Sequence, residues 1–429
     1  MGAQHKTTPQ QSETEIGHPV IAASLQRDFF ADSPSSHDGL DALLGDPAAR
    51  RLRVEKELWT PKQRQGNSLH EVSYRACFKS QLPNFFITRL SQPGDRVYDP
   101  FSGRGTTIVE AALLGRRVAA NDINPLSEIL SRPRIAPPSL LDIHGRIELI
   151  DLDHAPPAEP DEPDLSAFYH PETEQSLRAL RAYLQERRLS DAEDDMDRWI
   201  RMVATNRLTG HSPGFFSGYT LPPNQATTPE RQHGINAKRG QTPPRRDVKR
   251  IILKKSAQLQ SGLSEKYRLA MVPLASEAWF LTGRAQRTQA IPDESVMLTV
   301  TSPPFLDVVQ YAEDNWLRCW FNHVDVASVA AGMSVSPSPE IWSNEMLATL
   351  HELYRVAKRG GHVAFEVGEV RNGLIKLDEV IAPLGEAAGF VVKAVLINAQ
   401  TFTKTSNIWG VHNNSKGTNT NRIVLFLKE

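Results

Sequence analysis

Cysteine is scarce in this chain of 429 residues, which holds only Cys77 and Cys319. Two thiols are too few for a disulfide framework or a four-thiolate metal site. No apolar run approaches the roughly 18 residues that a membrane-spanning helix requires. The N-terminal stretch is polar and lacks the apolar centre of a signal peptide. We therefore expect a cytoplasmic protein with no membrane partner.

Net charge is also small, at −1 for the whole chain, so total charge does not indicate a polyanionic partner. The distribution is uneven, however. Residues 151–198 carry fourteen acidic side chains against five arginines, whereas residues 225–262 carry nine basic side chains against two acidic ones. A segregated basic block can bind phosphates, although a solvated basic helix explains the same pattern equally well.

The order of apolar segments predicts a doubly wound, mostly parallel α/β sheet with a large insert. Residues 95–122 read as strand, helix and strand, with Thr107 and Glu110 at capping-box spacing. The alternation then stops and resumes near residue 278. We predict an N-terminal arm at 1–60, partly disordered, and a first part of the α/β domain at 61–130. A mainly helical and irregular insert at 131–274 precedes the second part at 275–429.

The first candidate site is the loop DPFSGRGTT at 99–107, between the first strand and its helix. Its two glycines let the backbone approach a ligand, and the helix N-terminus directs free amides toward it. The third glycine of the dinucleotide fingerprint is absent, because position 108 is Ile. Asp99 would repel a pyrophosphate, and Asp122 suits ribose hydroxyls. The loop therefore favours S-adenosylmethionine, which has a sulfonium, an ammonium and a ribose, over NAD.

The second candidate site is TSPPF at 301–305, which follows the apolar segment VMLTV. Its prolines fix the backbone and cannot donate hydrogen bonds. Their carbonyls remain as acceptors at the carboxyl end of a strand, where open α/β sheets bind ligands. Ser302 adds a hydroxyl and Phe305 a flat apolar face. Taken alone, the motif is explained as well by a rigid turn.

Together the two motifs fit methyl transfer to an amino group of a nucleic-acid base. Such an amine is a poor nucleophile because its lone pair is delocalised into the ring. The Ser302 hydroxyl and the Pro303 carbonyl could accept its two hydrogens and free that lone pair. Phe305 could stack on an extruded base, as in base-flipping enzymes. Catalysis would then depend on positioning and hydrogen bonding.

These motifs resemble those of the amino-methylating DNA methyltransferases of restriction–modification systems. DPFSGRGTT is similar to their cofactor motif, and TSPPF to their catalytic motif in the Ser-Pro-Pro-aromatic form typical of cytosine-N4 enzymes. RVAKRGGHVAFEVGEV and GTNTNRIVLFLKE are similar to later units of their sheet. HEVSYRACFKSQLPNFF is similar to the segment over the methionine end of their cofactor. The resemblance covers roughly residues 65–130 and 275–429.

The resemblance implies the S-adenosylmethionine-dependent methyltransferase fold and transfer of a methyl group to cytosine N4 in flipped, double-stranded DNA. The insert would be the target-recognition region, and its Phe215, Phe216 and Tyr219 either contact DNA or form a small core. We expect no metal site, because the histidines are scattered. The cofactor residues would be Tyr74, Phe78, Asp99, Pro100, Phe101, Gly103, Gly105, Thr106, Thr107 and Asp122. The catalytic residues would be Ser302, Pro303, Pro304 and Phe305. The DNA-binding residues would be Arg239, Arg245, Arg246, Lys249, Arg250 and Lys254.

Three alternatives remain open at this stage. The same site could methylate adenine N6, a related sheet could serve guanine N2 of RNA, or the chain could bind DNA without catalysis. Gly283 and Arg284 stand where many relatives have Gly-Asp, so the group that contacts the cofactor adenine is not identified. The family setting suggests a paired restriction endonuclease. No motif gives the recognition sequence or the oligomeric state.

Overall fold

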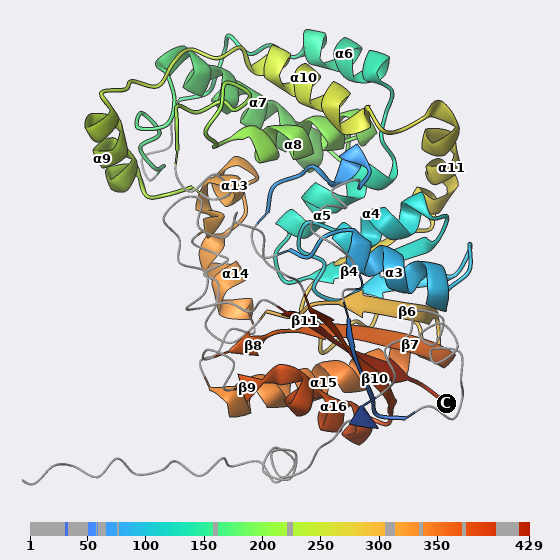
Figure 1. Cartoon of the computed structure of the whole chain (residues 1–429). Coiled ribbons are helices and arrows are strands. Elements are labelled where there is room, and N and C mark those ends of the chain that lie inside the picture. Colours follow the sequence, from blue (N-terminus) through green and yellow to red (C-terminus); the bar gives the residue numbers. More distant parts are fainter. Residues whose placement is uncertain are drawn as a thin grey trace, which may run out of the picture.

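A nine-stranded sheet forms the centre of the computed structural model (Figure 1). The structure describes residues 31–32, 50–56, 58, 66–74, 77–157, 162–220, 226–304, 314–333, 338–370, 375–399 and 420–429. The strand order is β1-β2-β10-β11-β7-β6-β3-β4-β5. The strands are β1 (Ala31–Asp32), β2 (Leu52–Lys56), β3 (Arg96–Asp99), β4 (Arg117–Asp122), β5 (Trp279–Thr282), β6 (Val296–Thr301), β7 (Ala357–Val367), β10 (Val391–Ala399) and β11 (Thr420–Leu427). Every pairing is parallel except the two made by β11, which confirms the predicted doubly wound, mostly parallel sheet.

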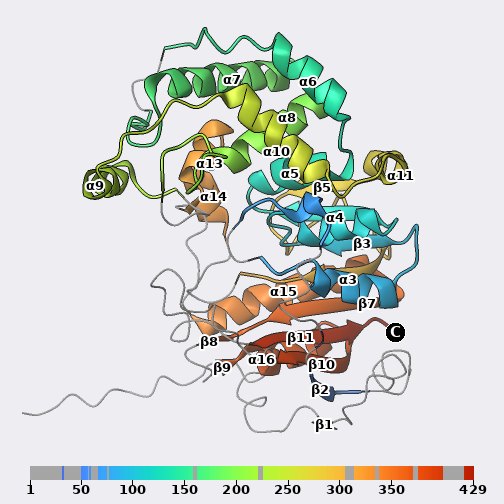
Figure 2. The same cartoon turned by 45° about the horizontal axis from the view of Figure 1, so that its top comes forward.

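Helices cover both faces of this sheet (Figures 1 and 2). One face carries α3 (Gln81–Leu90), α4 (Thr106–Leu113) and α5 (Leu126–Ser131), and the other carries α15 (Pro339–Val356) and α16 (Leu377–Ala387). Successive strand residues point to opposite faces. In β7, Ala364 therefore joins the core beneath α3 and α4, whereas Val363 and Phe365 join the core beneath α15 and α16. This two-sided burial accounts for the continuous apolar runs in the sequence.

The strand order reverses between β3 and β6, which lie side by side and parallel. The connections from these two strands leave in opposite directions, so a crevice opens at their carboxyl ends. The loop after β3 begins at Asp99, and the loop after β6 begins at Ser302. The topology thus brings the two sequence motifs to one edge of the sheet.

Helix α4 begins differently from the predicted capping box. Its N-cap is Gly105, at φ +75°, and no side chain caps the helix. A Cβ at this position would lie 2.3 Å from the Cβ of Ser131, so glycine is required for both backbone conformation and packing. Glu110 is occupied elsewhere, because its two carboxylate oxygens bond to His70 and Asn84. The capping-box prediction is therefore wrong.

The insert packs above the face of the sheet that carries α4 (Figures 1 and 2). Its apolar residues, such as Trp199 and Ile252, belong to the same buried cluster as Ile108 of α4 and Leu298 of β6. The insert therefore shares its core with the α/β part. Its helices are α6 (Leu140–Leu149), α7 (Pro171–Leu189), α8 (Asp195–Arg207), α9 (Pro229–Arg239), α10 (Val248–Gln260) and α11 (Glu265–Ser276).

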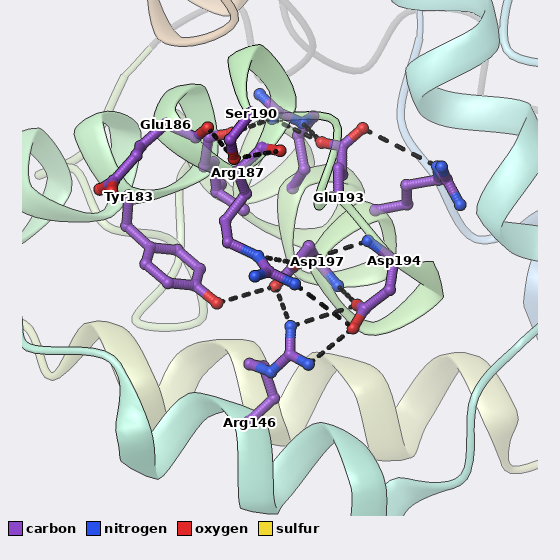
Figure 3. Close-up of polar contacts among 11 residues, drawn as sticks. Arg146, Tyr183, Glu186, Arg187, Ser190, Glu193, Asp194 and Asp197 are labelled. Atoms are coloured by element: carbon purple, nitrogen blue, oxygen red, sulfur yellow. Dashed lines mark hydrogen bonds and ion pairs between the residues drawn. The ribbon is translucent and has the colours of Figure 1, made fainter.

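A polar network joins three helices of the insert (Figure 3). Asp197 of α8 is fully buried and accepts hydrogen bonds from Arg146 of α6 at 2.5 Å and from Tyr183 of α7 at 3.0 Å. Arg187 of α7 donates to its other oxygen at 2.8 Å. Asp194 caps α8 and also pairs with Arg146 at 2.6 Å. One carboxylate thus links α6, α7 and α8.

Part of the predicted N-terminal arm enters the sheet. Strand β2 pairs in parallel with β10, with Leu52 beside Ala394. A small hairpin of β8 (Glu369–Val370) and β9 (Ile375–Lys376) stands apart from the main sheet. Shorter elements are the 3-10 turns η1 (Ser68–His70) and η2 (Arg132–Ile135) and the helices α13 (Trp316–Phe321) and α14 (Val326–Gly332). No helix in the described ranges is long and apolar enough to cross a membrane.

Candidate active site

A cavity opens at the carboxyl edge of the sheet, where β3, β4 and β6 end. Residues from both sequence motifs face it, including Asp99 and Asp122 on one side and Ser302 and Pro304 on the other. The remaining lining residues are Tyr74, Cys77, Phe78, Pro100, Phe101, Ser102, Gly103, Thr106, Ile123, Gly283, Arg284, Ala285, Gly332 and Met333. A ligand held by the first motif would therefore lie against the second.

Two carboxylates, the buried Asp99 and the partly buried Asp122, form the polar wall of the cavity. Asp99 is 1 % exposed, and its Oδ1 accepts hydrogen bonds from Thr301 Oγ1 at 2.7 Å and from the Phe101 amide at 3.2 Å. Asp122 accepts from the amides of Gly103 at 2.8 Å and Asn124 at 2.9 Å. Burial raises the pKa of Asp99 to about 7 and the pKa of Asp122 to about 6. Both groups would gain from a cation or from hydroxyl donors.

The segment around Tyr74 closes the cavity from the side of the first motif. Arg104 holds this segment, because its guanidinium donates to the carbonyls of Val72 at 3.0 Å and Phe78 at 3.3 Å. The Gly103 Cα faces this wall, since an added Cβ would lie 3.8 Å from the sulfur of Cys77. Cys77 therefore lines the cavity, which its sequence spacing alone does not indicate.

Two residues of the proposed cofactor loop do not line the cavity. Gly105 faces Ser131, as described above. The Thr107 hydroxyl donates to the carbonyl of Val300 at 3.0 Å, which ties α4 to β6. Thr106 does reach the cavity, and Arg104 Nε donates to its hydroxyl at 3.1 Å. Gly105 and Thr107 therefore support the loop through their contacts with Ser131 and β6, and they do not line the cavity.

The second motif is held by its neighbours on both sides. The indole of Trp342 donates to the Pro304 carbonyl at 2.9 Å, which fixes the turn after β6. Ser302 is partly buried, and its hydroxyl is within hydrogen-bonding reach of the Glu366 carboxylate. Pro303 is buried beside it and does not line the cavity. Phe305, the proposed stacking residue, lies outside the described residues.

Glu366 is a further candidate that the sequence did not single out. It lies near the end of β7, next to β6, and is 6 % exposed. Its carboxylate accepts a hydrogen bond from the Asn421 amide. Burial raises the pKa of Glu366, and the nearby Ser302 hydroxyl and the Asn421 amide oppose this rise. The sequence around Glu366 carries no motif that would indicate this placement.

The lining suits S-adenosylmethionine. Carboxylates face the cavity where an ammonium or sulfonium would be stabilised, and Tyr74, Phe78 and Phe101 supply apolar surface. One lining hydroxyl, Ser102 Oγ, is buried without a partner among the described residues, so it has unmet capacity to bond a ligand. Within the same ranges, no group of three His, Cys, Asp or Glu side chains could hold a metal.

A second, open groove of about 2120 Å³ runs along the insert between α7 and α10. Five of the six proposed DNA-binding residues line it: Arg245, Arg246, Lys249, Arg250 and Lys254. Arg239 does not, since it lies at the end of α9 with its guanidinium 3.8 Å from the ring centre of Tyr219. Phe216 is fully buried in the core, and Phe215 packs under Arg207 at 4.0 Å. Asn224 and Gln225 lie outside the described residues.

The insert also contacts the segment that follows the second motif. The indole of Trp320 on α13 donates to Glu162 at 3.1 Å, and Arg181 of α7 donates to the Trp320 carbonyl at 2.9 Å. Trp316 donates to the Thr227 carbonyl at 3.2 Å. The indole N–H groups of both tryptophans therefore join α13 to the insert.

Comparison with known proteins gives a match in the first part of the chain. Residues 24–128 match a protein-family model, N6_N4_Mtase, described as DNA methylase. The chain is 39% identical over 67 residues to the type II methyltransferase M.MvaI of Kocuria varians, which is 15% of each protein. It is 30% identical over 104 residues to the type II methyltransferase M.BsoBI of Geobacillus stearothermophilus, which is 20% of each. The chain thus matches only a fifth or less of the length of these curated relatives.

Solved structures are similar at much lower identity. TrmN from Thermus thermophilus is 13% identical, with 83% of this chain and 50% of that chain covered and a TM-score of 0.30. A TehB-like SAM-dependent methyltransferase from Corynebacterium glutamicum is 8% identical, with 82% and 89% covered and a TM-score of 0.29.

Proposed function

Since the chain belongs to the amino-methylating DNA methyltransferase family through residues 24–128, we propose that it transfers a methyl group from S-adenosylmethionine to cytosine N4 in double-stranded DNA. The observation that carries this proposal is the single cavity that Asp99 and Ser302 both line. The Ser-Pro-Pro form of the second motif favours cytosine over adenine. A guanine-N2 RNA methyltransferase fits less well, because a long insert with a basic groove interrupts the α/β part.

Binding of the cofactor would rest on the first motif and its surroundings. Asp99 would face a cationic group of the cofactor, and Asp122 would accept hydrogen bonds from ribose hydroxyls. Phe101, Phe78 and Tyr74 would cover the apolar parts, since all three line the cavity. When bound, the cofactor supplies an electrophilic methyl carbon. The carboxylates would hold that carbon toward Ser302 and Pro304.

Activation of the base would rest on the second motif. The Ser302 hydroxyl would accept a hydrogen bond from the exocyclic amine, and the Pro303 carbonyl would accept another. These bonds draw the amine toward tetrahedral geometry, which frees its lone pair to form the N–C bond as the C–S bond breaks. Ser302 is partly buried and Pro303 is buried, and hydrogen bonds are stronger where water is partly excluded.

Glu366 would receive the proton that the amine loses. Its buried carboxyl has a raised pKa and lies near the Ser302 hydroxyl, so the proton can pass from the amine to Ser302 and from Ser302 to Glu366. A carboxyl whose pKa is raised toward neutrality is suited to this role. Asn421 would hold the carboxylate in place through its hydrogen bond.

The experiment is to incubate the chain with duplex DNA and S-adenosylmethionine labelled in the methyl group, digest the DNA, and identify the labelled nucleoside. We expect N4-methylcytosine. Labelled N6-methyladenine would instead show that the site methylates adenine. Label found only in RNA, in a parallel incubation with RNA, would instead show an RNA methyltransferase. A chain that binds DNA and cofactor but transfers no label would be a DNA-binding homologue without catalysis. Ser302→Ala is the matched control, because it removes one hydroxyl and leaves the carboxylates intact.

A further inference from the structure

Two buried cations lie at the base of the basic groove, apart from the exposed residues considered so far. Lys255 of α10 is 5 % exposed and Arg207, the last residue of α8, is 8 % exposed. Both line the groove. Burying like charges together is unfavourable unless an anion compensates them.

The compensation inside the chain is weak. Lys255 Nζ lies 3.8 Å from Glu71, whose side chain is 53% exposed and also accepts from Gln258 Nε2 at 2.6 Å. Arg207 donates to its neighbour Asn206, through the backbone carbonyl at 3.1 Å and the side-chain oxygen at 2.6 Å. Within the described residues, no carboxylate forms an ion pair with Arg207.

The surroundings disfavour the charged form of both side chains. Burial first, and then the charge of Arg207, lower the pKa of Lys255 to about 8. Burial first, and then Arg318, lower the pKa of Arg207 to about 10. An anion in the groove would oppose both shifts by compensating the buried positive charge, so its binding would be favoured.

The chain segment at Ser73 and Tyr74 lies between the two cations and the cofactor cavity. Asn206 donates to the Ser73 carbonyl at 3.2 Å, and Arg318 donates to the same carbonyl at 3.1 Å. The next residue, Tyr74, lines the cavity. An anion between Lys255 and Arg207 would thus be bound close to the segment that lines the cofactor cavity.

We infer that Lys255 and Arg207 bind a backbone phosphate of the DNA strand beside the flipped nucleotide. This inference rests on the proposed function and deepens it. The exposed groove residues would attract the duplex, whereas the buried pair would fix its register relative to the cofactor cavity. DNA is the favoured polyanion because the family match is to DNA methylases.

The test measures DNA affinity against salt concentration for the full chain, with wild type, K255M, R207M and the control K266M. Lys266 is an exposed cation on α11 and does not line the groove. Each phosphate contact contributes about 0.9 to the slope of log K against log salt. We expect K255M and R207M each to lose about that much slope, or about eightfold in affinity near 0.1 M salt, with unchanged cofactor affinity. K266M should match wild type.

Unfolding experiments separate this role from a structural one. Because the buried pair repels itself, K255M without DNA should unfold at the same or a higher temperature than wild type. Lower stability together with an unchanged salt slope would overturn the inference. If neither variant folds, wild-type protein can be tested with duplexes in which a single phosphate near the target base is replaced by a neutral methylphosphonate. One such position should reduce binding about eightfold, and uniform loss at all positions would overturn the inference.

The outcomes also separate this inference from the proposed function. If wild type neither binds nor methylates DNA, the proposed function fails. If wild type methylates DNA but both variants keep the wild-type slope, only the phosphate site fails. If an RNA duplex binds more tightly and shows the same loss in the variants, the bound backbone is RNA and the assignment to DNA is overturned.

Discussion

Replacing Asp99 with Asn should separate cofactor affinity from protein stability. The Asp99 carboxyl is buried and has a pKa of about 7. It is therefore ionised in about one-tenth of molecules at pH 6 and about nine-tenths at pH 8. If the ionised form binds the cation, the affinity of wild type for S-adenosylmethionine should rise about tenfold between these pH values. Asp122, with a pKa of about 6, should add a factor of about two.

The substitution is nearly isosteric and preserves the local contacts. Thr301 and the Phe101 amide both donate to Oδ1 of Asp99, and an Asn side chain keeps one such oxygen. D99N should bind the cofactor about 10- to 100-fold more weakly at pH 8, because it loses a charge-assisted hydrogen bond. Between pH 6 and 8 its affinity should change by only about twofold, since Asp122 alone still titrates there.

Stability should move in the opposite direction. The pKa of Asp99 is higher in the folded chain than in the unfolded chain, so the folded state binds more protons between about pH 4 and 7 and loses stability as pH rises. D99N removes this loss, and its unfolding temperature at pH 8 without cofactor should exceed that of wild type. Calorimetric titration and thermal unfolding measure the two effects. A wild-type affinity that is flat or falls as pH rises would refute the reasoning about Asp99.

Three further predictions concern the second motif and the insert. S302A should slow methyl transfer by about 100-fold or more in single-turnover assays while cofactor affinity stays at the wild-type value, and unchanged transfer would exclude Ser302 from activating the amine. E366Q should lower kcat and flatten the pH profile of transfer, because it cannot take up the proton; an unaltered profile would leave Glu366 a structural residue. D197N should reduce the free energy of unfolding by about 3 kcal/mol in denaturant titrations, since Arg146 and Arg187 lose their shared buried charge. A change below about 0.5 kcal/mol would mean that the network in Figure 3 adds little.

The sheet and its two loops could be predicted from the sequence because the residues that indicate each of them are adjacent in the chain. The apolar strands around 96–99 and 296–301 read directly from the chain, and each is followed by its motif. Because parallel strands end at one edge of a sheet, the sequence also predicted that Asp99 and Ser302 would meet. Their common cavity agrees with that expectation.

Features made by distant segments could not be read in this way. Glu366 comes close to Ser302 only because β7 pairs with β6, and Cys77 reaches the cavity only because Arg104 holds its segment. The capping-box prediction failed for a similar reason, since Glu110 is drawn to His70 and Asn84. A charge pattern also does not show which of several basic residues is buried. Lys255 reads like its exposed neighbour Lys254, and only the packing of α10 distinguishes them.

The most direct test of the account is a crystal structure of the chain with a non-reactive S-adenosylmethionine analogue and a duplex that contains the methylated site. The account predicts the ammonium or sulfonium-equivalent group against Asp99, with the amine of an extruded cytosine within hydrogen-bond distance of Ser302 Oγ. The account would be contradicted by a structure in which the analogue and the base occupy separate cavities, or in which the target base remains stacked in the duplex.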